Sequence, residues 1–175
     1  MPQLIKHGVV VEDRWTLVRQ AGSLAGLVGG EPVIVPLALW LQARAALIAR
    51  SEAGVWLGPD DDPARIAPDA RFLPVIAIDF PVFTDGRGYS IARLLRERYA
   101  YQGELRAIGD VQRDQLHYLA HCGFDAFALP ANDVQAALAG FGDLSDGYQA
   151  TNLRTPWFRR RADASPPGDV WFPCA

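Results

Sequence analysis

The sequence predicts a single α/β domain, with three layers around a mostly parallel sheet and a short β-hairpin before it. Residues 74–129 hold three short apolar runs and two helical patterns between them, at 74–80, 91–101, 105–108, 111–122 and 124–129. The first run is continuous and β-branched, which is typical of a strand buried on both faces. Strands that alternate with helices in one sheet are parallel and joined by right-handed crossovers. Because the same alternation also builds part of a β/α barrel, a flavodoxin-like sheet and a half-barrel both remain open.

The first part of the chain predicts the hairpin and a further strand–helix–strand unit. Residues 4–18 alternate loosely between apolar and polar side chains, which indicates two short strands. Residues 32–36 form a short apolar run, and residues 37–50 follow with apolar side chains at helical intervals. Gly54 is expected just past the end of this helix, because glycine readily adopts the left-handed conformation found there. The next strand is expected at 55–57.

We expect residues 1–152 to form this domain and residues 153–175 to form an extended C-terminal tail. A last helix is predicted at 134–139, after which Gly, Pro, Ser and Asp become frequent and the apolar residues lose their period. The tail holds a basic cluster at 159–161 and four large aromatic residues. Two alternatives remain for it: a disordered terminus, or a segment that docks on a partner or on a second subunit.

Composition and charge narrow the class of protein. Of the 175 residues, 50% are hydrophobic and 21% charged, as expected of a soluble domain with a full core. The net charge of −3 argues against nucleic acid or a membrane surface as the partner. No apolar run approaches the roughly 18 residues that span a bilayer, and no signal-peptide pattern is present, so we expect a cytoplasmic protein. Two cysteines are too few for a disulfide framework or an iron–sulfur cluster.

An anion-binding loop is predicted where the sequence TDGRGYS separates the strand at 74–80 from the helix that follows. In a parallel sheet, the loops that leave the carboxyl ends of the strands form the binding edge. Gly86 and Gly88 would let the backbone approach a ligand, and Ser90 is expected to cap a helix whose N-terminus attracts anions. Arg87 adds a planar fork that suits phosphate, sulfate or carboxylate. The alternative is a tight turn, in which Asp85 bonds its own backbone and Arg87 pairs with a carboxylate.

Three further residues complete the predicted anion site at this edge: Arg106, Asp110 and Arg113. Arg106 lies in the next strand, Asp110 is expected to cap the helix after it, and Arg113 falls in the first turn of that helix. With Arg87, Arg113 could clamp an anion between two guanidinium groups. The structural alternative for Asp110 is that its carboxylate only complements the positive end of the helix.

Two other groups of polar residues offer metal chemistry, and in both the sequence favours a structural role. Asp60, Asp61 and Asp62 could hold a hard cation, but adjacent side chains point in different directions, so capping of a short helix that begins at Pro63 is the better interpretation. His117 and His121 share a helix face at a spacing that can bind zinc. They lack the intervening glutamate of a metalloprotease, and the face can equally be plain solvent-facing surface.

The segments DGRGYS and GELRAIGDVQRDQL, together with VVVEDRWTLV before them and FRRR after them, resemble the bacterial domain of unknown function 934. The resemblance covers roughly residues 4–161. Members of that family are described as oxidoreductases involved in sulfite reduction, and their genes lie beside those of sulfite reductase. The resemblance therefore implies a role in assimilatory sulfate reduction, without assigning an active site.

Three functions follow from residues and resemblance together. The first is an accessory protein of assimilatory sulfate or sulfite reduction that binds an oxyanion or the sulfite reductase itself. The second is an oxidoreductase in sulfite reduction with its site at the carboxyl edge of the sheet. The third is an anion- or nucleotide-binding regulatory domain. The expected partners are thus sulfite reductase or another enzyme of sulfate assimilation, a small oxyanion, and a second copy of the chain in a homodimer.

No cofactor motif is evident in the sequence, which has neither a dinucleotide fingerprint nor a cysteine pair. A flavin remains an option for the second function, because flavodoxin-like sheets bind one without a glycine fingerprint.

Overall fold

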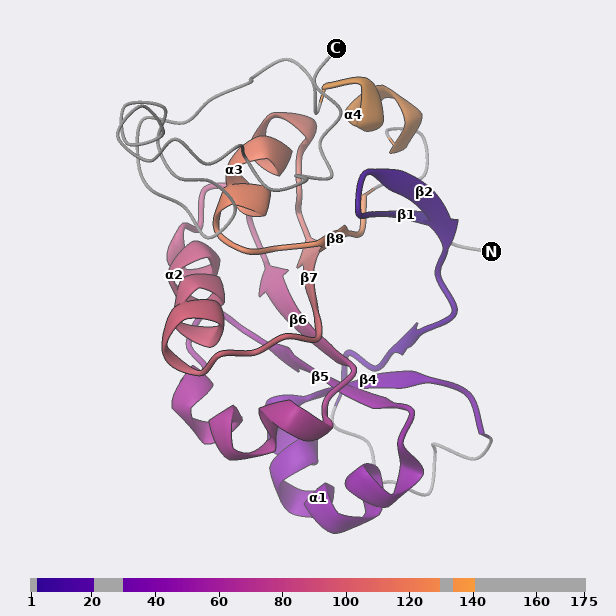
Figure 1. The fold of residues 1–175 in the computed structure, drawn as a ribbon, viewed down its shortest axis with the longest axis vertical. Coiled ribbons are helices and arrows are strands. Elements are labelled where there is room, and N and C mark those ends of the chain that lie inside the picture. Colours follow the sequence, from indigo (N-terminus) through magenta and orange to yellow (C-terminus); the bar gives the residue numbers. More distant parts are fainter. Residues whose placement is uncertain (1–2, 21–29, 130–133, 141–175) are drawn as a thin grey trace, which may run out of the picture.

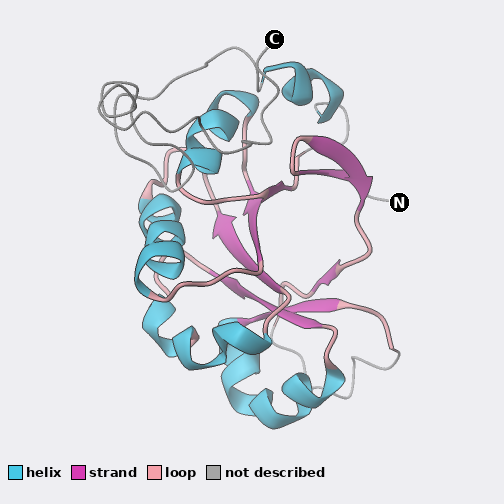
Figure 2. Ribbon diagram, viewed as in Figure 1, coloured by secondary structure: helices cyan, strands magenta, loops and turns pink. Residues whose placement is uncertain are grey.

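The computed structural model describes residues 3–20, 30–129 and 134–140, and these contain one eight-stranded sheet (Figures 1 and 2). The strands are β1 (Gln3–Lys6), β2 (Val9–Glu12), β3 (Thr16–Leu17), β4 (Val33–Pro36), β5 (Ala53–Leu57), β6 (Val75–Phe80), β7 (Glu104–Gly109) and β8 (Ala126–Phe127). The α-helices are α1 (Leu37–Arg50), α2 (Arg87–Arg93), α3 (Leu116–His121) and α4 (Val134–Gly140). Four short turns of other helix types are η2 (Pro63–Arg65), η3 (Ala67–Phe72), η4 (Leu94–Arg98) and η5 (Arg113–Gln115).

The strand order is β2-β1-β8-β7-β6-β5-β4-β3, and every neighbouring pair from β3 to β8 is parallel. Only β1 runs the other way, pairing antiparallel with β8 and with β2. The hairpin between β1 and β2 turns at His7 and Gly8, both of which have positive φ, as a two-residue hairpin loop requires. The predicted α/β class, the mostly parallel sheet and the leading hairpin are therefore confirmed.

The sheet is curled into a half-barrel because its two edge strands are consecutive in the chain. β2 and β3 stand at opposite ends of the strand order, yet only residues 13–15 connect them. Four steps of extended chain reach at most about 14 Å. Seven strand spacings of about 4.8 Å would separate the edges of a flat sheet by roughly 34 Å. The edges must therefore bend toward each other, and the half-barrel alternative is the one that forms (Figure 1).

The helices cover the outer face of the curl, so the sheet has one helical layer and not the two of a flavodoxin-like domain (Figure 2). Alternate strand residues point to this face and join apolar side chains of the helices in the main core. Trp40 of α1 is the largest fully buried side chain there, and Leu95 and Leu119 extend the core under η4 and α3.

The inner face holds a smaller apolar cluster of Ile34, Val75, Ala77 and Ile108. It also holds a network of charged side chains that includes a predicted site residue, Arg106.

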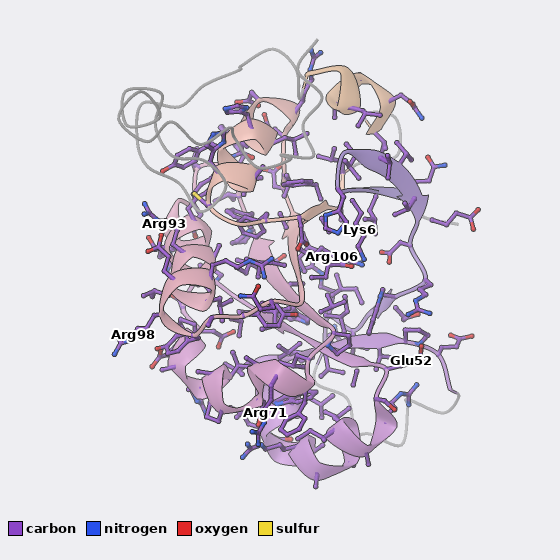
Figure 3. All side chains as sticks on the ribbon, in the orientation of Figure 1. Lys6, Glu52, Arg71, Arg93, Arg98 and Arg106 are labelled. Atoms are coloured by element: carbon purple, nitrogen blue, oxygen red, sulfur yellow. The ribbon has the colours of Figure 1, made fainter. Side chains whose placement is uncertain are left out.

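Arg106 is buried in the middle of β7, where it ties the two ends of the sheet together (Figure 3). Its Nη1–H groups lie 2.9 Å from both carboxylate oxygens of Asp13, in the linker between the edge strands. Its Nε–H donates to Glu104 Oε1 over 2.7 Å, and Lys6 Nζ of β1 lies 2.7 Å from the other oxygen of Glu104. The positive charges of Arg106 and Lys6 are thus compensated by the carboxylates of Asp13 and Glu104. Arg106 therefore helps to close the half-barrel. Asp13 and Glu104 occupy its guanidinium, and its part in an anion site stays a prediction.

Most element positions agree with the sequence patterns, and the differences occur at helix ends. The helix at 37–50 is confirmed, but it ends at Ser51, which adopts the left-handed conformation (φ 58°) and donates its N–H to Ile48 O. Gly54 lies inside β5, where a Cβ would stand 2.8 Å from Val75 O, so glycine is needed for close strand pairing. The helix expected at 91–101 begins earlier, as α2, and continues as the π-type turn η4.

The predicted helix at 111–122 forms as η5 followed by α3. The domain boundary at 152, the tail at 153–175 and its basic and aromatic residues lie outside the described residues. Within the described ranges, no helix combines the length and the apolar character needed to cross a bilayer.

Candidate functional site

The loops that leave β5, β6 and β7 meet at the carboxyl edge of the sheet, where Arg87 joins two of them. Its Nε–H donates to Asp85 Oδ1 over 3.0 Å, and its Nη2–H donates to Asp85 Oδ2 over 2.7 Å. Its Nη1–H donates to Asp60 Oδ1, from the loop after β5. The guanidinium therefore bridges the loop after β5 and the loop after β6, and it binds the Asp85 carboxylate through two parallel hydrogen bonds.

This arrangement matches the tight-turn alternative for the DGRG segment. The hydrogen bonds from Arg87 lower the pKa of Asp85 below its ordinary value, and the same bonds raise the pKa of Arg87. Asp85 Oδ1 also accepts from the backbone N–H of Arg87 over 3.1 Å, so the carboxylate binds the first N–H of α2 as well as the guanidinium. An incoming anion would have to replace Asp60 on the guanidinium, and anion binding here stays a prediction.

Gly88 and Ser90 have other roles than the sequence predicts. Ser90 lies inside α2 and cannot be its N-cap, because the helix already begins at Arg87 with Gly86 in the N-cap position. Gly88 is buried, and a Cβ there would stand 2.6 Å from Phe80 Cζ, so this glycine allows α2 to pack on β6. Gly86 has open space around it, with nothing within 4 Å of a Cβ.

Asp110 holds the loop after β6 instead of capping its own helix. Its Oδ2 accepts from the backbone N–H of Phe83 over 3.0 Å, while Gln115 Nε2–H donates to Phe83 O over 2.8 Å. The helix after Asp110 is capped by Gln112 and Gln115, because the chain stays extended as far as Gln112 before η5 begins. Arg113 is the first residue of η5, and its clamp with Arg87 stays a prediction.

The anchored loop presents apolar side chains to solvent. Val82 and Phe83 are 51% and 49% exposed, although the backbone of Phe83 is held on both sides. Tyr118 of α3 is also exposed, and its ring lies 5.0 Å from that of Tyr89 in α2. Gln115 connects the loop after β6 with α3, since its side chain binds Phe83 O and it lies one turn before Tyr118. We call Val82, Phe83, Tyr89 and Tyr118 the edge surface.

A second group of polar residues at this edge, on the inner face, was not predicted from the sequence. Asp79 is the fifth residue of β6, and its Oδ1 accepts from Arg19 Nη1–H over 2.6 Å. The Arg19 guanidinium lies 5.7 Å from the ring centroid of Trp56, whose indole N–H donates to Val18 O over 2.8 Å. One charged residue near the carboxyl end of an otherwise apolar strand is the signal that could have found Asp79.

Residues of both groups that the sequence offers for metal chemistry contact other groups of the protein. Asp62 accepts from the backbone N–H of Ala64 over 2.9 Å and so caps η2, as the sequence favours. The rings of His117 and His121 lie 4.2 Å apart, and His121 Nδ1 lies 2.8 Å from His117 O. Across residues 3–20, 30–129 and 134–140, no cluster of three or more His, Cys, Asp or Glu side chains has the geometry to hold a metal ion. Burial raises the pKa of the Cys122 thiol.

Comparison with known proteins gives one result. A search of curated proteins returned no match. The model of a family described as "Bacterial protein of unknown function (DUF934)" matches residues 54–158, which include most of β5, all of β6, β7 and β8, and the loops that leave β5, β6 and β7. The match covers more than half of the chain and agrees with the resemblance of the DGRGYS and GELRAIGDVQRDQL segments. This protein therefore belongs to the DUF934 family.

Proposed function

We propose that this protein is an accessory protein of assimilatory sulfate or sulfite reduction, and that it binds the sulfite reductase through the edge surface. The observation that supports docking is that Val82 and Phe83 expose apolar side chains while hydrogen bonds hold the backbone of Phe83 in place. Apolar side chains on a loop whose backbone is already fixed lose little conformational entropy on binding. Aromatic residues at such positions commonly dominate the energy of a protein interface.

The charge at the same edge favours a protein partner over a free oxyanion. Arg87 is neutralised by Asp85 and Asp60, and Asp61 and Asp110 add further carboxylates nearby. An apolar group framed by carboxylates suits a partner surface with apolar side chains inside a basic rim. A free oxyanion would meet repulsion from the same carboxylates.

The test is a titration of this protein with the sulfite reductase of the same organism, followed by native mass spectrometry and calorimetry. A complex should form, and Phe83→Ser should weaken it by roughly fivefold to tenfold. This magnitude follows because about half of the Phe83 side chain is still available for burial, worth about 1–1.5 kcal/mol.

Phe72→Ser is the matched control, because Phe72 is 45% exposed but precedes β6, at the other edge of the sheet. Its affinity for the reductase should equal that of the wild type. Absence of a complex, or equal weakening by both variants, would refute docking through the edge surface.

A second candidate function, an oxidoreductase with its site at the same edge, is favoured by one observation. Asp79 places a carboxylate at the mouth of the half-barrel, on the inner face, where barrel enzymes position their reacting groups. A flavin bound to the purified protein, with a visible spectrum altered in Asp79→Asn, would support this function. A colourless protein whose reductase complex is unchanged in Asp79→Asn would favour the accessory function.

A further inference from the structure

A cleft of about 670 Å³ lies at the opposite edge of the sheet, where the strands begin. One wall is η3, which leads to β6, and the other is the loop at 99–103, which leads into β7. This volume falls within the range of small-molecule sites. The cleft shares no residue with the edge surface.

The η3 wall is fixed to the body of the protein through a buried carboxylate. Asp69 is 1% exposed and accepts from the indole N–H of Trp40 over 2.8 Å and from Arg44 Nε–H over 2.7 Å. Both donors belong to α1, so η3 cannot move without breaking a buried, charged hydrogen-bond group.

The opposite wall is fixed independently. Arg96 Nη1–H groups donate to Tyr101 O over 2.6 Å and to Gly103 O over 2.9 Å. The hydroxyl of Tyr101 lies 3.1 Å from Leu73 O, across the base of the cleft. Ala100 is held at φ 51°, a conformation that costs a non-glycine residue energy and persists only where its surroundings impose it. Both walls are therefore preformed, and a ligand would not have to order them.

The side chains that line this cleft define the chemistry of a ligand. Arg71 is the charged residue of the lining, and among the described residues it forms no ion pair; its guanidinium lies 4.6 Å from the ring centroid of Phe72. Tyr99 contributes an aromatic side chain to the lining; the guanidinium of Arg98, which is not part of the lining, lies 5.8 Å from the centroid of that ring. Gln102 donates one amide hydrogen to Ala100 O, which leaves its carbonyl to accept.

We propose that this cleft is a binding site for a small planar anion, either a nucleoside monophosphate or an aromatic carboxylate. The ring packs against Tyr99, the negative group binds Arg71, and a polar edge of the ring meets the Gln102 amide. Guanidinium groups bind phosphate and carboxylate by two parallel hydrogen bonds, and aromatic rings stack favourably on tyrosine. The site is independent of reductase binding, because it lies at the other edge of the sheet.

Isothermal titration calorimetry with adenosine 5′-monophosphate and with naphthalene-2-carboxylate tests the site and separates the two ligand classes. At least one probe should bind with a Kd below about 1 mM. Arg71→Gln should weaken that probe at least about tenfold, by loss of the charged hydrogen bonds. Adenosine, which keeps the ring but lacks the phosphate, should bind Arg71→Gln and the wild type equally.

Arg14→Gln is the matched control, because Arg14 is an exposed arginine on the linker between the edge strands, and it should bind both probes like the wild type. Tyr99→Leu, which keeps an apolar side chain, should also weaken the probe that binds. If neither probe binds at about 5 mM, or if Arg71→Gln and Arg14→Gln bind equally, the proposal is overturned. Arg71→Gln should still bind the reductase, so failure of this site and failure of the proposed function give different results.

Discussion

Replacing Arg106 by leucine should lower the free energy of unfolding by about 3–5 kcal/mol. The side chain of Arg106 is 3% exposed, and its partners Asp13 and Glu104 are 14% and 7% exposed. In Arg106→Leu, the apolar stem is largely kept while both carboxylates stay in the inner face, with only Lys6 beside Glu104. Removing one member of a buried ion pair is costly because the remaining charge is left without compensation.

Urea denaturation followed by circular dichroism measures this loss. With a denaturant slope of about 2–3 kcal/mol per molar, the midpoint should fall by roughly 1–2.5 M. Arg14→Leu is the control, because the Arg14 side chain is 70% exposed and its Nη1 lies 3.5 Å from Glu52 Oε1. Its free energy of unfolding should fall by less than about 1 kcal/mol. Equal midpoints for the two variants would refute the view that the network closes the half-barrel.

Two further predictions concern the DGRG segment. Gly88→Ala should destabilise the protein by about 1–3 kcal/mol, because the added Cβ would meet the Phe80 ring, whereas Gly86→Ala should change stability by less than about 0.5 kcal/mol. Thermal unfolding compares the two variants, and equal losses would contradict the packing of α2 on β6. Because Arg87 lowers the pKa of Asp85, this carboxylate stabilises the fold above its ordinary pKa, and that contribution disappears as the pH falls through the lowered value. In Arg87→Gln, an NMR titration should show the pKa of Asp85 raised toward its ordinary value; an unchanged pKa would mean that the pair does not form in solution.

Local patterns predict the elements whose residues mainly contact their neighbours in sequence. The apolar spacing of 37–50 is enough to place α1, and Asp62 before a proline is enough to place the cap of η2. Helix ends are less predictable, because competing residues decide them. Ser51 ends α1 before Gly54 is reached, and α2 begins at Arg87, before Ser90.

The inner face could not be predicted, because it depends on how the sheet curls. Arg106 follows an apolar residue in a short strand, and the sequence does not say which side of that strand is enclosed. The strand register shows the surroundings of this side chain. Arg106 pairs with Ala77 on β6 and with Ala126 on β8, two small residues that leave room for the guanidinium. Its partner Asp13 lies 93 positions earlier, so no local pattern could pair them.

The pairing of β1 with β8 also determines when the fold can be completed. Ile5 pairs with Phe127, so in the described sheet the hairpin of β1 and β2 has no neighbour for β1 until β8 has been synthesised. Contacts between residues so far apart in sequence close late and slow the search for the native state. Meanwhile the parallel strands from β4 to β7 can pair in the order in which they are made, because each lies beside its predecessor. Docking of the hairpin of β1 and β2 therefore has to wait for the synthesis of β8, whereas pairing among β4 to β7 does not.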